Sequence, residues 1–314
     1  MWRYYEGIKL KSLSESKPYV YGKVQKHGMR IVRLEYDYIC NFHCQHCDIK
    51  PYQGKSDRRA LTIPDVKELS RQADELGFAQ FVISGGEPLI YPEFDKIVEA
   101  IDPQKFYITT DTNGWLLDDI RLERLKAVGV DKIQVSIDNM DARIHDKFRG
   151  KEGSRDKAGF AVMAAQRHGF NVIVQTVVDK QRANSRELID FLQGWKMLGI
   201  PVYVGYAKPV GLWKGRDDLM LDQADIDYVE ALCKKYNAFS HITPTGGCIA
   251  MKRMINITKW GDVNPCPVMQ EYSIGNIFNE PLKDIVARGD KQFAGHIPTC
   301  PMAVEKDYIE RINK

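Results

Sequence analysis

The sequence predicts an α/β fold, in which parallel strands are joined by helices, followed by a smaller C-terminal appendage. First, β-type runs alternate with amphipathic helical segments over most of the chain, which is typical of strand–helix–strand units. Second, this rhythm stops near residue 240, after which a hairpin and a short helix are expected. Third, 314 residues of which 44% are hydrophobic can bury one large core, and α/β barrels of this length are common.

Six strand–helix units are expected before residue 240. The expected strands cover residues 31–36, 80–84, 106–110, 132–137, 171–178 and 202–206. The expected helices cover residues 62–77, 92–101, 118–128, 157–168, 185–198 and 223–236. The first helix is the clearest, because Thr62 can cap it, Pro64 fits its first turn and Gly77 can end it.

This pattern divides the chain into three segments. We expect residues 1–28 to form an N-terminal extension packed on the barrel, residues 29–239 the barrel, and residues 240–314 a separate C-terminal domain. Within the last segment, residues 254–258 and 263 are expected to pair as a β-hairpin, and residues 280–288 to form a helix.

Charge and hydropathy exclude several classes of protein. The net charge is 45 − 42 = +3, with both signs mixed along the chain, which argues against a dedicated nucleic-acid binder or a polybasic membrane anchor. No apolar run approaches the length of about 18 residues that a membrane span needs, and the first residues lack the apolar core of a signal peptide. We therefore expect a cytoplasmic protein.

The seven cysteines point to metal chemistry. Cys40, Cys44 and Cys47 form a C-x3-C-x2-C cluster, and the other four lie in the last third of the chain at Cys233, Cys248, Cys266 and Cys300. A reducing compartment disfavours disulfides. Structural zinc is an alternative, but neither His43 nor His46 completes a usual four-ligand zinc pattern. Three thiolates suit an iron–sulfur cluster in which one iron stays open.

The cysteine cluster and a second motif together resemble one enzyme family. Cys40 to Cys47 read Cys-Asn-Phe-His-Cys-Gln-His-Cys at the end of the first expected strand, and Ser84-Gly85-Gly86-Glu87-Pro88 end the second. This combination resembles the radical S-adenosylmethionine enzymes. The resemblance implies a partial (β/α)6 TIM-type barrel over residues 31–208 and a [4Fe–4S] cluster on the three thiolates. It also implies bound S-adenosylmethionine, a 5′-deoxyadenosyl radical that abstracts a hydrogen atom, and a flavodoxin- or ferredoxin-like electron donor.

The same resemblance implies contacts for the bound cofactor. The segment Gly85, Gly86, Glu87 and Pro88 would bind the methionine amino group, where two glycines let the backbone approach a ligand closely. His46 would lie against the adenine, with a solvated loop histidine as the alternative. Polar groups at later strand ends match ribose, carboxylate or substrate contacts, although such groups also cap helices; they are Asn113, Ser136, Asp138 and Gln175.

The C-terminal cysteines match a second cluster-binding pattern. Cys248, Gly261 and Cys266 form C-x12-G-x4-C, and Cys300 follows. This spacing resembles SPASM or shortened twitch domains, which implies a second, auxiliary [4Fe–4S] cluster. Many relatives have C-x2-C at the last place, whereas this chain has Ala303. Either the auxiliary cluster therefore has only three protein ligands, or its fourth ligand is Cys233, Glu305, Asp307 or the substrate. The alternative is that the three cysteines hold no cluster and are purely structural.

Cys233 has two interpretations. It falls on the apolar face of the expected helix 223–236, together with Val229 and Leu232, so a plain core cysteine is favoured. The other interpretation is that its thiol returns a hydrogen atom to a substrate radical, which would make the protein an epimerase.

The substrate is expected to be small and polar. Aromatic and basic residues near the barrel mouth suit a polar molecule, neutral or anionic, such as a sugar. These residues are Tyr203, Tyr206, Lys208, Trp213, Lys214, Arg216, Lys252 and Arg253. A leader-binding domain would be unusual in the 39 residues before Cys40, which favours a carbohydrate-like metabolite over a ribosomal peptide. The leading hypothesis is a dehydrogenation assisted by the auxiliary cluster. The alternatives are epimerisation, thioether or carbon–carbon bond formation on a peptide, and a non-catalytic cluster-binding or maturation protein.

Overall fold

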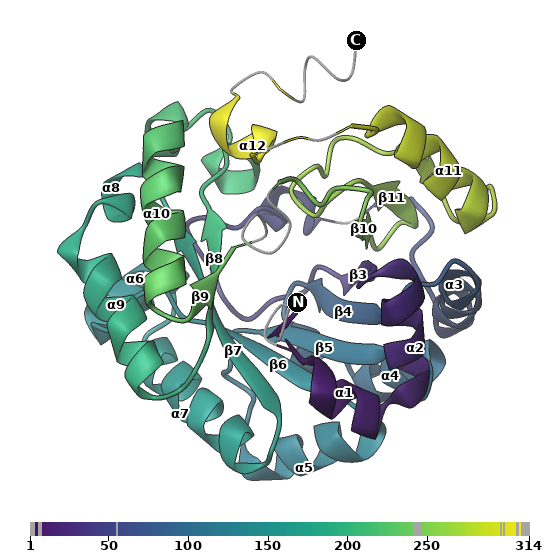
Figure 1. The fold of residues 1–314 in the computed structure, drawn as a ribbon, viewed down its shortest axis with the longest axis horizontal. Coiled ribbons are helices and arrows are strands. Elements are labelled where there is room, and N and C mark those ends of the chain that lie inside the picture. Colours follow the sequence, from purple (N-terminus) through teal and green to yellow (C-terminus); the bar gives the residue numbers. More distant parts are fainter. Residues whose placement is uncertain are drawn as a thin grey trace.

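The computed structural model describes residues 4–5, 8–54, 56–240, 247–295, 297, 299–305 and 308. One curved sheet surrounded by helices dominates these residues (Figure 1). Among them, no helix is long and apolar enough to cross a membrane.

The six expected strands all form, and they pair in chain order as a parallel sheet. They are β3 (Ile31–Asp37), β4 (Gln80–Gly85), β5 (Tyr107–Thr112), β6 (Lys132–Ser136), β7 (Asn171–Val178) and β8 (Val202–Tyr206). A short β9 (Ala238–Phe239) extends the sheet beside β8, again in parallel. The predicted partial barrel with six strand–helix units is therefore confirmed.

The crossover helices cover the outer face of this sheet (Figure 1). The six expected ones are α3 (Ile63–Glu75), α4 (Phe94–Ile101), α5 (Asp119–Val128), α7 (Ser154–Arg167), α9 (Arg186–Met197) and α10 (Gln223–Lys235). Two short helices were not predicted: α6 (Ala142–Arg149) and α8 (Lys180–Ala183). Short 3-10 helices follow the strands at Lys50–Tyr52, Pro88–Ile90, Gly211–Trp213 and Asp217–Leu219.

The C-terminal hairpin belongs to the same sheet. It comprises β10 (Met254–Ile257) and β11 (Asp262–Asn264), with a short β12 (Gly275–Asn276) beyond it. Because β10 pairs in parallel with β3, with Asn256 opposite Arg33, the sheet runs without a break from the hairpin into the barrel. Residues 254–276 are thus joined to the barrel by backbone hydrogen bonds. The helices after the hairpin are α11 (Leu282–Gln292) and α12 (Pro301–Val304).

Alternation along the strands separates an apolar outer face from a polar interior. In β3, Val32 and Leu34 are buried in the main core, whereas Arg33 and Glu35 alternate with them and face the barrel interior. Because the carboxyl ends of parallel strands meet at one end of a barrel, the loops that follow them gather there.

The N-terminal segment closes the opposite end of the barrel. Two short strands, β1 (Tyr4–Tyr5) and β2 (Ile8–Lys9), precede helices α1 (Leu10–Ser16) and α2 (Pro18–His27). Leu13 and Val20 pack against Tyr107, at the first position of β5, in a second apolar cluster. Lys17 forms an ion pair with Asp131 at 2.5 Å and donates to the carbonyl oxygens of Pro103 and Phe106.

Replacing Lys17 with methionine is expected to destabilise the protein by roughly 2–4 kcal/mol, because a mostly buried carboxylate loses its cation. Burial already raises the pKa of Asp131, and Lys17 opposes that rise. Without Lys17 the pKa of Asp131 in the folded protein rises further. The loss in free energy of unfolding is therefore complete above that pKa and becomes smaller as the pH falls toward about 4, where Asp131 is protonated in the variant. Urea unfolding across this pH range measures the effect. Lys26→Met, an exposed change on α2, is the control, and equal loss in both variants would contradict the assignment.

Candidate active site

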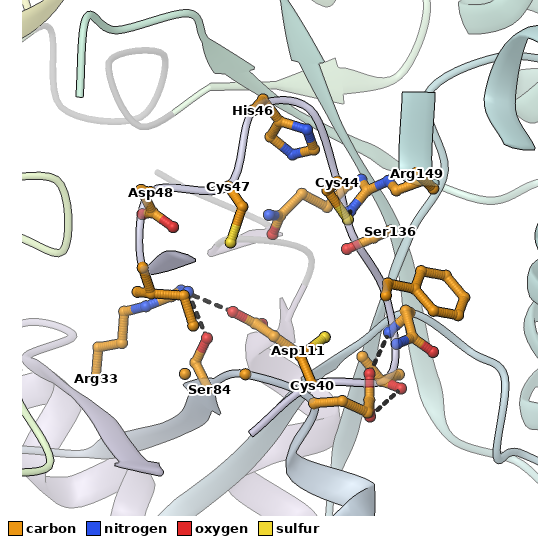
Figure 2. Close-up of a pocket in the computed structure, with 18 residues that line it drawn as sticks. Arg33, Cys40, Cys44, His46, Cys47, Asp48, Ser84, Asp111, Ser136 and Arg149 are labelled. Atoms are coloured by element: carbon orange, nitrogen blue, oxygen red, sulfur yellow. Dashed lines mark hydrogen bonds and ion pairs between the residues drawn. The ribbon is translucent and has the colours of Figure 1, made fainter. Parts of the chain in front are cut away.

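Three N-terminal cysteines surround one cavity at the carboxyl ends of the strands. Cys40, Cys44 and Cys47 lie on the loop that follows β3, residues 40–47, which we call the cysteine loop. They line a cavity of about 130 Å³, here called the cysteine cavity, and Figure 2 shows their sulfur atoms turned toward the same space. The structure therefore brings together the three residues that the sequence predicted as cluster ligands.

Two glycines at the end of β4 allow the cysteine loop to begin where it does. Gly86 N–H donates to the carbonyl oxygen of Asp37 at 3.0 Å, and Glu87 N–H donates to that of Ile39 at 2.9 Å. A Cβ on Gly86 would collide with the Ile39 carbonyl, and one on Gly85, whose φ is +108°, would collide with the Asp37 carbonyl. The glycines line the cavity, but the backbone whose close approach they permit is that of residues 37–39, directly before the cysteine loop.

Glu87 links three of the strand-end loops. Its buried carboxylate accepts from Thr112 Oγ1 at 2.8 Å and from Asn113 N–H at 2.7 Å. The Asn113 side chain in turn donates to Asn41 Oδ1, on the cysteine loop, at 2.8 Å. Burial raises the pKa of Glu87 to about 7. Both Glu87 and Asn113 line the cysteine cavity, whereas Pro88 lies behind it in a 3-10 turn and is absent from the lining.

The C-terminal end of α6 supports the cysteine loop from the other side. Gln45 N–H donates to the Phe148 carbonyl oxygen at 2.9 Å, and a Cβ on Gly150 (φ +64°) would lie 2.5 Å from the His43 carbonyl oxygen. The Phe148 ring also stacks on the ring of His46, with ring centroids 4.6 Å apart and an interplanar angle of 4°. The sequence did not predict α6, so this support was missed.

His46 is a packed aromatic side chain that lines the cysteine cavity. Its ring forms a three-ring cluster with Phe148 and Trp213, and the Trp213 centroid lies 5.7 Å from that of His46 and 6.1 Å from that of Phe148. The Nδ1 atom of His46 is buried without a hydrogen-bond partner among the described residues. Burial lowers the pKa of His46 to about 3, so the imidazole is neutral. His46 is thus packed among aromatic rings, and its contact with the adenine stays a prediction.

Asp138 pairs with Arg149, a residue that was not predicted from the sequence, and Arg149 reaches the cavity in its place. Asp138 Oδ2 accepts from Arg149 Nε at 2.6 Å, and both side chains are almost fully buried. Arg149 lines the cysteine cavity and its Nη1 lies 3.9 Å from Cys44 Sγ, whereas Asp138 itself is not part of the lining. The Arg149 guanidinium holds the pKa of Asp138 well below its usual range, although burial opposes this. Ser136 and Gln175 line the cavity as predicted.

A polar triad from three adjacent strands also lines the cavity. Arg33 on β3 donates to Asp111 on β5 at 2.7 Å and to Ser84 on β4 at 2.5 Å (Figure 2). The missed signal is in the sequence of β3, where Arg33 and Glu35 alternate with apolar residues. Charged residues at alternating positions of an otherwise apolar strand indicate a polar barrel interior.

The three thiols fit a cluster better than a single ion. A structural zinc ion takes four ligands close to one point, usually from paired cysteines and histidines. The thiols instead surround a cavity, and soft sulfur donors suit an iron–sulfur cluster. Burial raises the pKa of Cys40 to about 11 and that of Cys47 to about 12, so thiolates there need a cationic partner such as iron.

The C-terminal cysteines also gather, in a second place. Burial raises the pKa of Cys266, and the charges of Cys248 and Cys300 raise it further, so the three thiols lie within electrostatic reach of one another. Cys248 is held by its N–H, which donates to the Ile297 carbonyl oxygen at 2.8 Å. Of the possible fourth ligands, Cys233 lies elsewhere, in the core, and Asp307 lies outside the described residues.

A larger cavity of about 400 Å³ lies beside the cysteine cavity; we call it the C-terminal cavity. Asp48, the residue after Cys47, lines both cavities. The C-terminal chain supplies one wall, with Gln270 and Glu271 after Cys266 and Met302 and Glu305 after Cys300. The loop after β8 supplies another wall, which includes Lys214 and Asp217.

The basic residues predicted to hold an anionic substrate are engaged elsewhere. Lys214 pairs with Glu271 at 2.8 Å, Arg216 pairs with Asp218 at 2.7 Å, and Lys208 donates to the Tyr206 carbonyl oxygen at 2.8 Å. The remaining members also have structural contacts: Lys252 with Gly295, Arg253 with Met29, Trp213 with His46, Tyr203 with Phe239, and Tyr206 with Glu230. These contacts do not form an anion site.

Cys233 is a core residue. It is 1% exposed on α10, packs within the main apolar cluster and lines neither cavity. Burial raises the pKa of its thiol far above the usual range. The structure thus places it where the plain core interpretation expects it and away from the cysteine loop.

Gly86→Ala is expected to destabilise the apoprotein by at least about 2 kcal/mol and to lower the iron bound by the cysteine loop, because the new Cβ displaces the backbone before Cys40. Gly22→Ala, in α2, is the matched control: nothing lies within 4 Å of its added Cβ, so it should be neutral or slightly stabilising. Urea unfolding and iron analysis after anaerobic reconstitution measure both effects. A Gly86→Ala protein with the wild-type midpoint and iron content would contradict the close-approach argument.

Comparison with known proteins identifies the family. The radical SAM superfamily model matches residues 35–192, which is half of the chain, and the model of SPASM, an iron-sulfur cluster-binding domain, matches residues 248–298. The antilisterial bacteriocin subtilosin biosynthesis protein AlbA of Bacillus subtilis is 26% identical to this chain. The match covers 80% of this chain but only 58% of the length of AlbA. An AdoMet-dependent heme synthase of Methanosarcina barkeri is 25% identical over 82% of this chain and 81% of its own.

A solved structure has the same fold. Streptococcus suis SuiB bound to its precursor peptide SuiA superposes with a TM-score of 0.66 at 18% identity, covering 89% of this chain and 70% of SuiB. The radical SAM model spans Cys40, Cys44 and Cys47, and the SPASM model spans Cys248 and Cys266 but ends before Cys300. The chain therefore belongs to the radical S-adenosylmethionine superfamily, as an enzyme with a SPASM domain whose cofactors are S-adenosylmethionine and [4Fe–4S] clusters.

Proposed function

We propose that this enzyme removes a hydrogen atom from a substrate bound in the C-terminal cavity and oxidises that substrate further. One observation carries the proposal. Asp48 lines both cavities, and the far wall of the C-terminal cavity follows Cys266 and Cys300. A molecule bound there lies between the two groups of cysteines.

The residues assigned to each cofactor divide between the two cysteine groups. Cys40, Cys44 and Cys47 would hold the first cluster, and Cys248, Cys266 and Cys300 the second. When bound, the first cluster and S-adenosylmethionine supply the radical that takes a hydrogen atom, and the second cluster can accept the electron that a net oxidation releases. The protein would supply orientation: the neutral His46 ring would lie against the nucleoside, and the Arg149 guanidinium, which lines the cysteine cavity, would bind the methionine carboxylate.

The charge of the C-terminal cavity favours a substrate with a cationic group. Asp217, Glu271 and Glu305 contribute carboxylates to its wall, against the single ammonium of Lys214. Asp48 adds a further carboxylate, so acidic residues outnumber basic ones in the lining by formal charge. A protonated amine or guanidinium fits this charge, whereas an anionic sugar or sugar nucleotide does not.

A peptide is the second candidate for the substrate, and a specific similarity favours it. AlbA, whose name places it in the biosynthesis of a bacteriocin, matches 80% of this chain. A lysine or arginine side chain of a peptide and an amino sugar present the same cationic chemistry to the cavity. The epimerase alternative lacks its hydrogen donor at the site, because Cys233 is buried in the core away from both cavities.

Removing either group of cysteines tests the two-cluster assignment. Anaerobically reconstituted wild type should bind about eight iron atoms per chain, and the Cys248→Ala/Cys266→Ala/Cys300→Ala variant about four. That variant should still cleave S-adenosylmethionine to 5′-deoxyadenosine, whereas Cys40→Ala/Cys44→Ala/Cys47→Ala should not. Iron and sulfide analysis with product chromatography measures these outcomes. A C-terminal variant that keeps the wild-type iron content would refute the second site.

Neutralising one wall carboxylate tests the substrate cavity. Cationic and anionic candidate substrates, lysine-rich and glutamate-rich peptides among them, are compared by the 5′-deoxyadenosine formed above the substrate-free level. The cationic set should stimulate, and Asp217→Asn should raise the KM for it by up to about fivefold through the loss of one charge contact at an exposed residue. Asp218→Asn is the matched control, because the adjacent Asp218 pairs with Arg216 outside the cavity lining. Stimulation by the anionic set alone would overturn the charge assignment.

A further inference from the structure

Unpaired lysines gather beside the cysteine loop. Lys50 follows the loop in a 3-10 turn, Lys147 lies on α6, and Lys151 and Lys157 lie between α6 and the first turns of α7. We call these four residues the lysine face. Among the residues that the structure describes, none of the four takes part in an ion pair, whereas Lys17, Lys23, Lys180, Lys214 and Lys259 all do.

Contacts tie each of these lysines to the cysteine loop. Lys50 Nζ lies 3.2 Å from His43 Nδ1, and the Lys147 carbonyl oxygen accepts from Gln45 Nε2 at 3.2 Å. Lys151 and Lys157 lie over the Trp115 ring, 4.6 and 6.0 Å from its centroid. That ring packs edge-on against Phe42, with centroids 5.9 Å apart. Each lysine is therefore linked, directly or through the Trp115 ring, to a residue of the loop whose sulfurs line the cavity.

The surroundings of these lysines are basic and partly apolar. Between residues 147 and 157 four basic side chains are at least partly exposed, Lys147, Lys151, Arg155 and Lys157, against the two acidic residues Glu152 and Asp156. Arg149 is buried in its pair with Asp138. Two exposed apolar side chains border the face, Leu116 at 38% and Ile144 at 54% exposure. Exposed apolar groups among like charges are typical of a transient protein–protein contact, in which charge steers the encounter.

We propose that the lysine face docks an acidic protein that delivers one electron to the cluster behind the cysteine loop. Exposed residues of that loop, His43 and Gln45, lie within the face, so a docked donor comes close to the cluster ligands. The net charge of +3 is spread over the whole chain, and a face of four lysines is small for a nucleic-acid site.

The electron transfer balances without a further reactant. The anionic hydroquinone of a flavodoxin gives up one electron and becomes the neutral semiquinone, and the cluster held by Cys40, Cys44 and Cys47 gains that electron. No proton needs to move. This proposal concerns the delivery of the electron and does not depend on which substrate the C-terminal cavity takes.

Reversing charge on the lysine face tests the proposal. The variant is Lys147→Glu/Lys157→Glu, because both side chains are exposed and neither touches the cavity. The matched control is Lys26→Glu/Lys234→Glu, which makes the same charge change at exposed positions on α2 and at the C-terminal end of α10. Reconstituted enzymes are titrated with oxidised flavodoxin by calorimetry. Cluster bleaching by flavodoxin hydroquinone is followed by stopped-flow absorbance, without any substrate.

The lysine-face variant should bind flavodoxin at least about tenfold more weakly and be reduced at least about tenfold more slowly at low salt. The loss should shrink as ionic strength rises, because salt screens the attraction. Reduction by dithionite should match the wild type in both variants, which shows that the cluster is intact. Wild-type binding and reduction in the lysine-face variant, or an equal loss in the control, would overturn the proposal.

Discussion

The close approach of two backbone segments, at the carboxyl ends of β3 and β4, is the constraint on which the site depends. Gly85 and Gly86 lack the Cβ atoms that would strike the carbonyl oxygens of Asp37 and Ile39, so the chain can enter the cysteine loop while hydrogen-bonded to β4. Glu87 then fixes the next loop through Thr112 and Asn113. Three thiols cannot fix the geometry of a site by themselves. The backbone contacts of these glycines and of Glu87 position them here.

The same sheet connects the two cysteine groups. β10 pairs directly with β3, so the segment between Cys248 and Cys266 is an extension of the barrel rather than a detached module. Side chains strengthen the junction, because Gln270 donates to the buried Glu35 at 2.9 Å and Lys259 pairs with Asp37 at 3.1 Å. A cavity between these elements can therefore hold a substrate in a fixed relation to both groups of thiols.

Sequence patterns were sufficient for the repeating part of the fold and for the ligands. Strand–helix alternation is a local signal, so β3 to β8 appeared within one or two residues of their predicted ends. Cysteine spacing likewise identified both groups of thiols. The pairing of β10 with β3 could not be predicted, because it joins residues more than 200 positions apart.

The parts of the site that escaped prediction depend on tertiary contacts. Arg149 is an ordinary helical arginine in the sequence, and only the fold of α6 brings it to Asp138 and Cys44. The basic residues after β8 pointed to an anionic substrate, but their charges are taken up by neighbours such as Glu271 and Asp218. Pairing between side chains is invisible to composition, so the sequence could not show that Lys214 and Arg216 already have acidic partners.

The most direct test of the central claim is Mössbauer spectroscopy of the Cys248→Ala/Cys266→Ala/Cys300→Ala protein reconstituted with ⁵⁷Fe, recorded with and without S-adenosylmethionine. If Cys40, Cys44 and Cys47 hold a [4Fe–4S] cluster with one open iron, one iron of the four should change its isomer shift when S-adenosylmethionine is added. Four irons that are unchanged by S-adenosylmethionine, or no cluster at all, would contradict the account.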